Sequence, residues 1–439
     1  KEREQMKNFG LIFQYEIKKI THRKLWLIAF AAILLFTILL NLYTIFDFSV
    51  GWSGAQVLKA NKNNDGLVID KSAFFNGIPI YYVNDSDELV EEKVSPLKYI
   101  QMQRQFAMEW SGKPIDNETI REMQAFIDEY DFVGEKNYSY GWSIQNYYWV
   151  YRTINYMGLN PRYENMSEEN IKANIELQRD STNDGEQLTK EEKEYWSNHT
   201  KLEYPLKMAY TCAYKEIIDK VHWINLVLLL YVIVVLCDAC TVDRTRRLSS
   251  IIRSTQKGTR KAIVARLCAG MTVTIVSALV LYGFTAIFQF GLFGVDGFHT
   301  PIQQIGGYQW SSLMISAGQA VLLVYLMSII LCVMTGAITM LLSELLQNSI
   351  GAILLPCVFL LYSLLFDKSI FHRNRQFSQL WQYFPIQRIP EILYDGRMVS
   401  VGNKMFEAVP LSLTIYFSLS VLALTLCAII AFLRKCDRK

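Results

Sequence analysis

Residues 238–268 read DACTVDRTRRLSSIIRSTQKGTRKAIVARLC and join two long apolar runs of the chain. The acidic residues of this stretch are Asp238 and Asp243, and basic residues far outnumber them. The basic residues are Arg244, Arg246, Arg247, Arg253, Lys257, Arg260, Lys261 and Arg266. A short, cation-rich loop between two membrane spans stays on the cytoplasmic side by the positive-inside rule. The stretch therefore predicts a polytopic membrane protein and fixes the orientation of its spans.

The same loop carries the pattern of a short amphipathic helix. Leu248, Ile251 and Ile252 recur at the three- to four-residue spacing of one helix face. Gly258 can end that helix before the next one starts at Ala262. Such a helix would lie against the inner leaflet, and one interpretation is that it only marks topology and binds anionic lipid head groups.

Six apolar runs predict a mainly α fold with six transmembrane helices. They cover residues 25–46, 222–241, 263–290, 312–342, 349–366 and 411–433. A helix of about 20 apolar residues spans the roughly 30 Å hydrocarbon core of a bilayer. Although 51% of the whole chain is hydrophobic, this average combines nearly uncharged runs with one long polar block.

The segments between these runs follow from placing the N-terminus inside. Residues 1–24 are polar and basic, with apolar residues at roughly helical spacing on one side, and predict an interfacial helix. The inside segments are then the loop 242–262, the short turn 343–348 and the basic tail 434–439, and the outside segments are 47–221, 291–311 and 367–410. The last of these is rich in cations, against the charge rule, and its Pro385 and Pro390 predict short helices dipping into the outer leaflet.

The polar block 47–221 predicts a mainly helical extracellular domain, with extended chain near 66–83. Acidic residues outnumber basic ones in it, and Thr189 with Glu192 forms a capping-box pattern ahead of a helical run, as does Thr119 with Glu122. Its most aromatic stretch, 138–156, includes Trp142, Tyr147, Tyr148 and Trp149. These rings would either bind an amphiphile or peptide, or form a core and an interfacial belt.

Polar and reactive side chains inside the spans are few. Gln289, Gln319, Thr272 and Thr274 are candidates for lining a substrate path, and hydrogen bonds between helices explain them equally well. Seven of the eight cysteines lie in or beside apolar runs. Cys237 and Cys240 have the spacing of a redox motif, but their place at the end of a span favours ordinary buried thiols.

Several catalytic motifs are missing from the chain. It lacks the phosphate-binding G-x-x-x-x-G-K-[ST], the metal-binding H-E-x-x-H and the nucleophile elbow G-x-S-x-G. Five scattered histidines predict no metal site, and the net charge of +3 gives no reason to expect nucleic acid. No charged residue lies mid-span, which argues against an ion-coupled transporter. We therefore expect that the chain is not an enzyme.

The order of residues in the basic loop resembles the cytoplasmic loop of type-2 ABC-transporter permeases. The family pattern opens with an acidic-basic pair, matched by Asp243 and Arg244, and an apolar run closing in Ser-Thr, matched by 251–255. Arg260 matches a basic position, and 265–266 matches a small-basic pair. In that family this segment is the coupling helix, which docks into a groove of the ATPase subunit, and the chain's first helix resembles the elbow helix. The resemblance assigns the docking contact to Leu248, Ile251, Ile252, Ser254, Thr255, Lys257 and Arg260.

The resemblance implies a permease subunit of an ATP-driven exporter in a bacterial plasma membrane, with both termini cytoplasmic. Its partners would be a second permease subunit, identical or related, two ATP-binding subunits and the lipid bilayer. ATP and Mg²⁺ would be bound by the ATPase subunits, with no cofactor in this chain. Permeases of this kind often handle antimicrobial peptides or amphipathic lipids. The alternatives are a non-transporting sensor that displays the aromatic domain, or a membrane enzyme acting on lipid or peptidoglycan.

Overall fold

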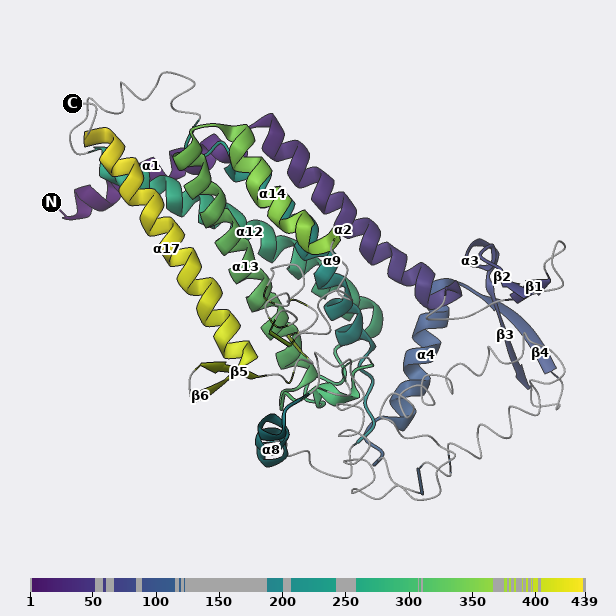
Figure 1. The fold of residues 1–439 in the computed structure, drawn as a ribbon. Coiled ribbons are helices and arrows are strands. Elements are labelled where there is room, and N and C mark those ends of the chain that lie inside the picture. Colours follow the sequence, from purple (N-terminus) through teal and green to yellow (C-terminus); the bar gives the residue numbers. More distant parts are fainter. Residues whose placement is uncertain are drawn as a thin grey trace.

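The computed structural model describes residues 2–51, 58–60, 67–83, 89–114, 118–119, 122, 188–199, 207–241, 258–306, 308, 311–365, 398–401 and 404–436, and isolated positions between 375 and 396. This part of the chain is mostly helical, and its long helices lie side by side in one bundle (Figure 1). The predicted mainly α fold is confirmed at this level.

Five helices among the described residues are long and apolar enough to cross a membrane. They are α2 (Lys24–Val50), α9 (Cys212–Leu236), α12 (Gly258–Phe293), α13 (Ala317–Leu346) and α17 (Ala408–Cys436). A sixth apolar helix, α14 (Ser349–Leu365), is 17 residues long and contains Pro356. At 1.5 Å per residue it is about 25 Å long, slightly shorter than a hydrocarbon core of roughly 30 Å.

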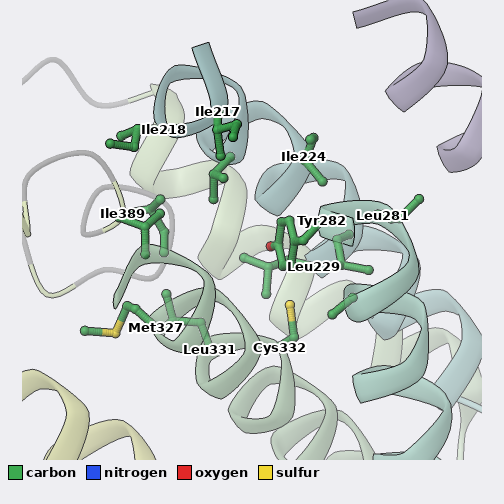
Figure 2. Close-up of a cluster of buried hydrophobic side chains, with 14 of the residues drawn as sticks. Ile217, Ile218, Ile224, Leu229, Leu281, Tyr282, Met327, Leu331, Cys332 and Ile389 are labelled. Carbon is green, nitrogen blue, oxygen red and sulfur yellow. The ribbon is translucent and has the colours of Figure 1, made fainter. Parts of the chain in front are cut away.

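The centre of the bundle is α13, which contacts α9, α12, α14 and α17. Figure 2 shows Leu229 of α9, Tyr282 of α12 and Cys332 of α13 converging in its buried core. The outer helices α2 and α17 instead expose large apolar side chains such as Leu35 and Phe417. A helix that is apolar all round is buried in protein or in lipid, so these outer faces suit contact with hydrocarbon.

Helix α9 begins well before the predicted start at residue 222. Its first turns carry the (i, i+4) pairs Lys215–Asp219, with 2.6 Å between Nζ and Oδ2, and Glu216–Lys220. Such pairs support a helix without raising its hydropathy. An apolar run alone therefore underestimates where this helix starts.

One end of the bundle carries α1 (Glu2–Thr21), and we call it the α1 end (Figure 1). Helix α1 packs against the first turns of α12. The same end contains the starts of α2, α12 and α14 and the ends of α9, α13 and α17. The loop 242–257, which lies outside the described residues, therefore leaves α9 and enters α12 at the α1 end.

The opposite end of the bundle, the hairpin end, carries the strands and short helices. They are β1 (Leu58–Ala60), β2 (Leu67–Ile69), α3 (Ala73–Asn76), β3 (Ile78–Val83), β4 (Leu89–Val94), α4 (Pro96–Trp110), α8 (Lys190–His199), η2 (Ile302–Gln304), β5 (Met398–Val401) and β6 (Lys404–Glu407). The strands form three antiparallel pairs, β1–β2, β3–β4 and β5–β6. The region 66–83, expected to be extended, contains β2 and β3 with the short α3 between them.

Helix α8 makes hydrogen bonds to residues near β5, which lie far from it in the sequence. The expected capping box is present: the Thr189 amide donates to Glu192 Oε2 at 2.7 Å, and the Glu192 amide donates to Thr189 Oγ1 at 3.3 Å. The buried Glu192 carboxylate also accepts hydrogen bonds from the Met398 amide and from Arg375. Trp196 Nε1 donates to the Gly396 carbonyl at 2.6 Å. The end of the polar block is thereby anchored beside the β5–β6 hairpin.

The segment 367–410 contains this hairpin, which follows the positions around Pro385 and Pro390 where the sequence predicted short helices dipping into the outer leaflet. Strands β5 and β6 pair antiparallel, Met398 opposite Glu407 and Val401 opposite Lys404. Pro385 and Pro390, on which that prediction rests, lie outside the described residues. Nearby Ile389, Ile392 and Leu393 are buried in the main core.

Candidate functional site

The α1 end holds a cluster of charged side chains at the exit of the basic loop. Glu16 of α1 is buried, with 5% of its surface exposed. Its Oε2 atom lies 3.5 Å from Lys19 Nζ and 3.6 Å from Arg266 Nε. Arg266 belongs to the first turns of α12, directly after the loop. The ion pair therefore connects the loop exit to α1.

The entry of the loop is held by hydroxyl groups. After α9 ends, Ser343 of α13 donates a hydrogen bond to the Cys237 carbonyl. Four residues later, the Thr241 hydroxyl lies 3.1 Å from that of Ser349, the first residue of α14. The chain thus enters the loop from a turn fixed to both α13 and α14.

Arg434 near the end of α17 completes this polar layer. Its guanidinium donates to the Glu344 carbonyl and, at 3.0 Å, to the Leu345 carbonyl. The last carbonyls of a helix have no partner inside the helix, so a cation from α17 satisfies the end of α13. The chain then turns into α14 through Gln347, whose φ is 55°. These contacts join α9, α13, α14 and α17 at the entry of the loop, and α1 and α12 at its exit. We call this layer the polar frame (Glu16, Cys237, Thr241, Arg266, Ser343, Glu344, Ser349 and Arg434).

Most of the expected docking residues cannot be placed in this frame. Leu248, Ile251, Ile252, Ser254, Thr255 and Lys257 lie outside the described residues. Arg260 is described, on the first turn of α12, and is exposed. Its guanidinium lies 4.6 Å from the ring centroid of Phe432 in α17, a cation–π distance. Arg260 therefore contacts the last helix of its own chain.

Gln289 belongs to a buried polar seam between α2 and α12. Its Nε2 donates to Asn41 Oδ1 at 2.8 Å and to Thr44 Oγ1 at 3.1 Å. Asn41 Nδ2 in turn donates to Thr285 Oγ1 at 3.2 Å and to the Thr37 carbonyl at 2.8 Å. All five side chains are at most 2% exposed. Gln289 thus joins two helices, which matches the interhelical alternative in the sequence interpretation.

The other three path candidates lie elsewhere. Thr274 and Thr272 are on α12, and each donates to the carbonyl four residues earlier in its own helix, Gly270 or Cys268. Fifteen residues of helix separate Thr274 from Gln289, about 22 Å. Gln319 forms a capping box with Ser316 at the start of α13. The structure therefore does not group these four residues along one path.

The partners of Gln289 were missed in the sequence, although a signal was present. Thr37, Asn41 and Thr44 are spaced by four and three residues, which places them on one face of α2. Attention to a polar stripe in the first span would have found that face. Its partner residues on α12 are not readable from one sequence, because pairing depends on how the helices pack.

The hairpin end has its own ion pair. Arg104 of α4 donates from Nε and Nη2 to Asp296 Oδ2, at 3.1 and 2.6 Å. Asp296 follows α12, two residues after Gly294, whose φ of 86° lies in the left-handed region. A side chain at Gly294 would meet the Arg104 guanidinium at 2.4 Å. The aromatic candidates Trp142, Tyr147, Tyr148 and Trp149 lie outside the described residues.

Two further observations bear on function. Within the described ranges, no group of three or more His, Cys, Asp or Glu side chains could hold a metal ion. Comparisons of the chain with protein-family models, curated proteins and solved structures find no match.

Proposed function

We propose that the chain is the permease subunit of a type-2 ABC exporter in a bacterial plasma membrane. Helix α1 is its elbow helix, and α14 is the sixth span beside the five longer ones. The α1 end then faces the cytoplasm, with both termini, and the hairpin end faces outward with the large domain. A second permease subunit and two ATP-binding subunits complete the transporter, and its cargo is an antimicrobial peptide, a lipid-like molecule or another amphiphile.

The observation that carries this proposal is the polar frame around the ends of the basic loop. The loop leaves α9 at a turn hydrogen-bonded to α13 and α14, and it returns through Arg266, paired with Glu16 of α1. Arg434 adds α17 to the same layer. A displacement of the loop by an ATPase would be transmitted to these helices through their hydrogen bonds and ion pairs. ATP could then bias an equilibrium between two conformations of the bundle.

The first experiment is purification of the tagged chain from membranes of its native host, with identification of the proteins that accompany it. We expect an ATP-binding polypeptide with phosphate-loop motifs. The double variant Thr255→Glu, Arg260→Glu adds negative charge to the expected docking contact, and it should lose this partner while the chain still inserts.

A control is needed because Arg260 also stacks on Phe432. Phe432→Leu removes the stack and keeps the cation, so it should retain the ATP-binding partner. If Phe432→Leu loses the partner as the double variant does, binding depends on the contact between α12 and α17. Direct docking of Arg260 on the ATPase would then not be needed to explain the loss. If the double variant keeps the partner and its turnover, the docking assignment is wrong. A kinase partner with no ATPase would favour the sensor.

A further inference from the structure

The short helix α3 presents a phenylalanine ring to its surroundings. Phe75 is 85% exposed, more than any other large apolar side chain in the described part of the chain. Its neighbour Phe74 instead packs against the small core that includes Val50 and Ile78. That core is therefore complete without Phe75. Because a large apolar ring is unfavourable in water, Phe75 suits an apolar environment outside the protein.

Helix α3 is held at both of its ends. At its start, Asp70 Oδ1 accepts hydrogen bonds from the Ser72 amide at 3.1 Å and from the Ser72 hydroxyl at 2.6 Å. The Asp70 carbonyl also accepts one from the Ala73 amide at 3.1 Å. At its end, Gly77 has a φ of 92°, and a side chain there would meet Lys93 Cβ of β4 at 3.0 Å. The direction of Phe75 is thus set by the fold around it.

A series of aromatic rings connects α3 to the outer surface of α2. The ring centroids of Phe75 and Phe74 lie 5.2 Å apart, and those of Phe74 and Phe46 lie 5.4 Å apart. Phe46 in turn lies 6.0 Å from Tyr43, which is 56% exposed on α2. Figure 1 shows α3 beside the last turns of α2, on the side away from the other long helices. Phe75 therefore continues the exposed apolar surface of α2.

The contact with Phe46 gives the depth of α3 relative to a bilayer. The uncharged run of α2 starts at Leu25, after Lys24, and ends before Asp47. A hydrocarbon core of roughly 30 Å that starts at Leu25 ends about 20 residues later, near Ile45. Phe46 lies at this boundary, and α3 contacts it there. Aromatic and apolar side chains are favoured at this level of a membrane.

We propose that α3 is a membrane anchor, with Phe75 inserted between the lipids of the leaflet on the side of the hairpin end. The surface that covers Phe75 is the bilayer itself, in its zone between hydrocarbon and head groups. Lys71 is exposed in the turn before α3, and a cation at this level is attracted to lipid phosphates. Strands β3 and β4 extend from α3 away from the bundle (Figure 1). The anchor thereby holds the start of the polar block at the membrane surface.

The test places an environment-sensitive fluorophore beside Phe75 in the full chain, reconstituted in phosphatidylcholine nanodiscs. Asn76→Cys provides an exposed thiol for it and leaves Phe75 in place, in a chain whose exposed Cys268 is replaced by serine. The same chain without Asn76→Cys gives the background labelling. We expect blue-shifted emission that lipids with a nitroxide near the head group quench more strongly than lipids with a nitroxide near the bilayer centre. Glu91→Cys, at an exposed position of β4, is the control and should show neither effect.

Two variants of Phe75 separate the ring from its surroundings. In the chain labelled at residue 76, Phe75→Ser should remove most of the quenching and return the emission towards that of the Glu91→Cys control. Phe75→Leu stays apolar and should keep both signals. Because the Phe75 side chain is 85% exposed, neither variant removes a group from a packed core.

Three outcomes would overturn the proposal. Emission at residue 76 like that in water would show that α3 does not reach the lipid. Blue-shifted emission that no nitroxide lipid quenches would show that protein, such as a second copy of the chain, covers Phe75. Equal quenching with Phe75 and with Phe75→Ser would show that the ring is not the anchor. These signals do not involve an ATPase, so the anchor can stand or fail separately from the proposed function.

Discussion

At the residue scale, two glycines three positions apart make a matched pair. Gly294 has a φ of 86° and faces the Arg104 guanidinium, whereas Gly291 is exposed in α12 with open space where a side chain would go. We expect Gly294→Ala to destabilise the protein by about 1–2 kcal/mol, because an L residue is strained in the left-handed region. Gly291→Ala should be neutral or stabilise by up to about 1 kcal/mol, as alanine does in a helix. Thermal unfolding in detergent measures both, and equal effects would contradict the backbone placed at Gly294.

The buried Glu16 gives a prediction about the polar frame. Glu16→Gln removes the charge that faces Arg266 and Lys19, and breaking a buried ion pair costs about 3 kcal/mol. Glu109 is exposed on α4, so Glu109→Gln should change stability by less than about 0.5 kcal/mol. Unfolding midpoints of the two variants measure the difference. If Glu16→Gln is as stable as the control, the frame does not depend on this pair.

Tyr195 provides a pH-dependent signal at the hairpin end. Its hydroxyl donates to Glu407 Oε1 at 2.5 Å, and this hydrogen bond, with burial and the Glu407 charge, raises the pKa of Tyr195 to about 12. Because the folded pKa lies above the ordinary value of 10.0, the stabilisation is complete below pH 10 and is lost as pH rises through about 12. Phenolate absorbance should show a contribution near pH 12 that is lost in Tyr195→Phe, and that in Glu407→Gln moves down towards 10.0; the difference spectrum against wild type isolates it from the other tyrosines. A step that does not move in Glu407→Gln would exclude this contact.

The sequence predicted the contacts of some single residues and not of others. The Thr189–Glu192 capping box was predicted correctly because its partners are local and depend only on spacing. The same local rule, Ser-x-x-Gln, describes Gln319, which the sequence interpretation placed in a path.

At the element scale, the seam between α2 and α12 predicts measurable coupling. The single variants Asn41→Leu and Gln289→Leu each leave polar groups of the other helix without a partner. The double variant should therefore lose less stability than the sum of the two, by about 0.6 to 1.7 kcal/mol, the range of interhelical hydrogen bonds in membranes. A double-mutant cycle measures this coupling energy. Thr272→Val changes a residue bonded to its own helix and should show no coupling to Asn41; additive losses at Asn41 and Gln289 would contradict the seam.

The existence of the long helices was predictable, and their boundaries were not. Uncharged runs mark the spans because the bilayer itself selects for them. Helices α9 and α12 begin earlier than the predicted residues 222 and 263, because ion pairs and the Arg260–Phe432 contact support their charged first turns. The β5–β6 hairpin was not predicted, although its two strands are adjacent in the sequence. Its contact with α8, through Tyr195 and Glu407, joins segments that no local pattern connects.

At the scale of the whole molecule, the proposed function depends on which helix ends lie together at each end of the bundle. The end of α9 and the start of α12, which flank the basic loop, share one end of the bundle with α1 and the end of α17, and α8 and β5–β6 lie at the other (Figure 1). The sequence predicted this alternation from six apolar runs and an inside N-terminus, with the cations of 367–410 against the charge rule. The polar frame was not predictable, because it consists of contacts between segments such as Glu16 with Arg266 and Glu344 with Arg434.

The most direct measurement is cross-linking from the loop itself. A variant of the chain lacking its exposed Cys268 and carrying Ser254→Cys is joined to a photoactivatable reagent in inside-out membrane vesicles of the native host. Illumination should attach an ATP-binding polypeptide to residue 254. The same variant with Thr255→Glu and Arg260→Glu also introduced should give a much lower yield of this cross-link. Attachment to lipid alone, or labelling of residue 254 by an impermeant thiol reagent added outside intact cells, would contradict the account.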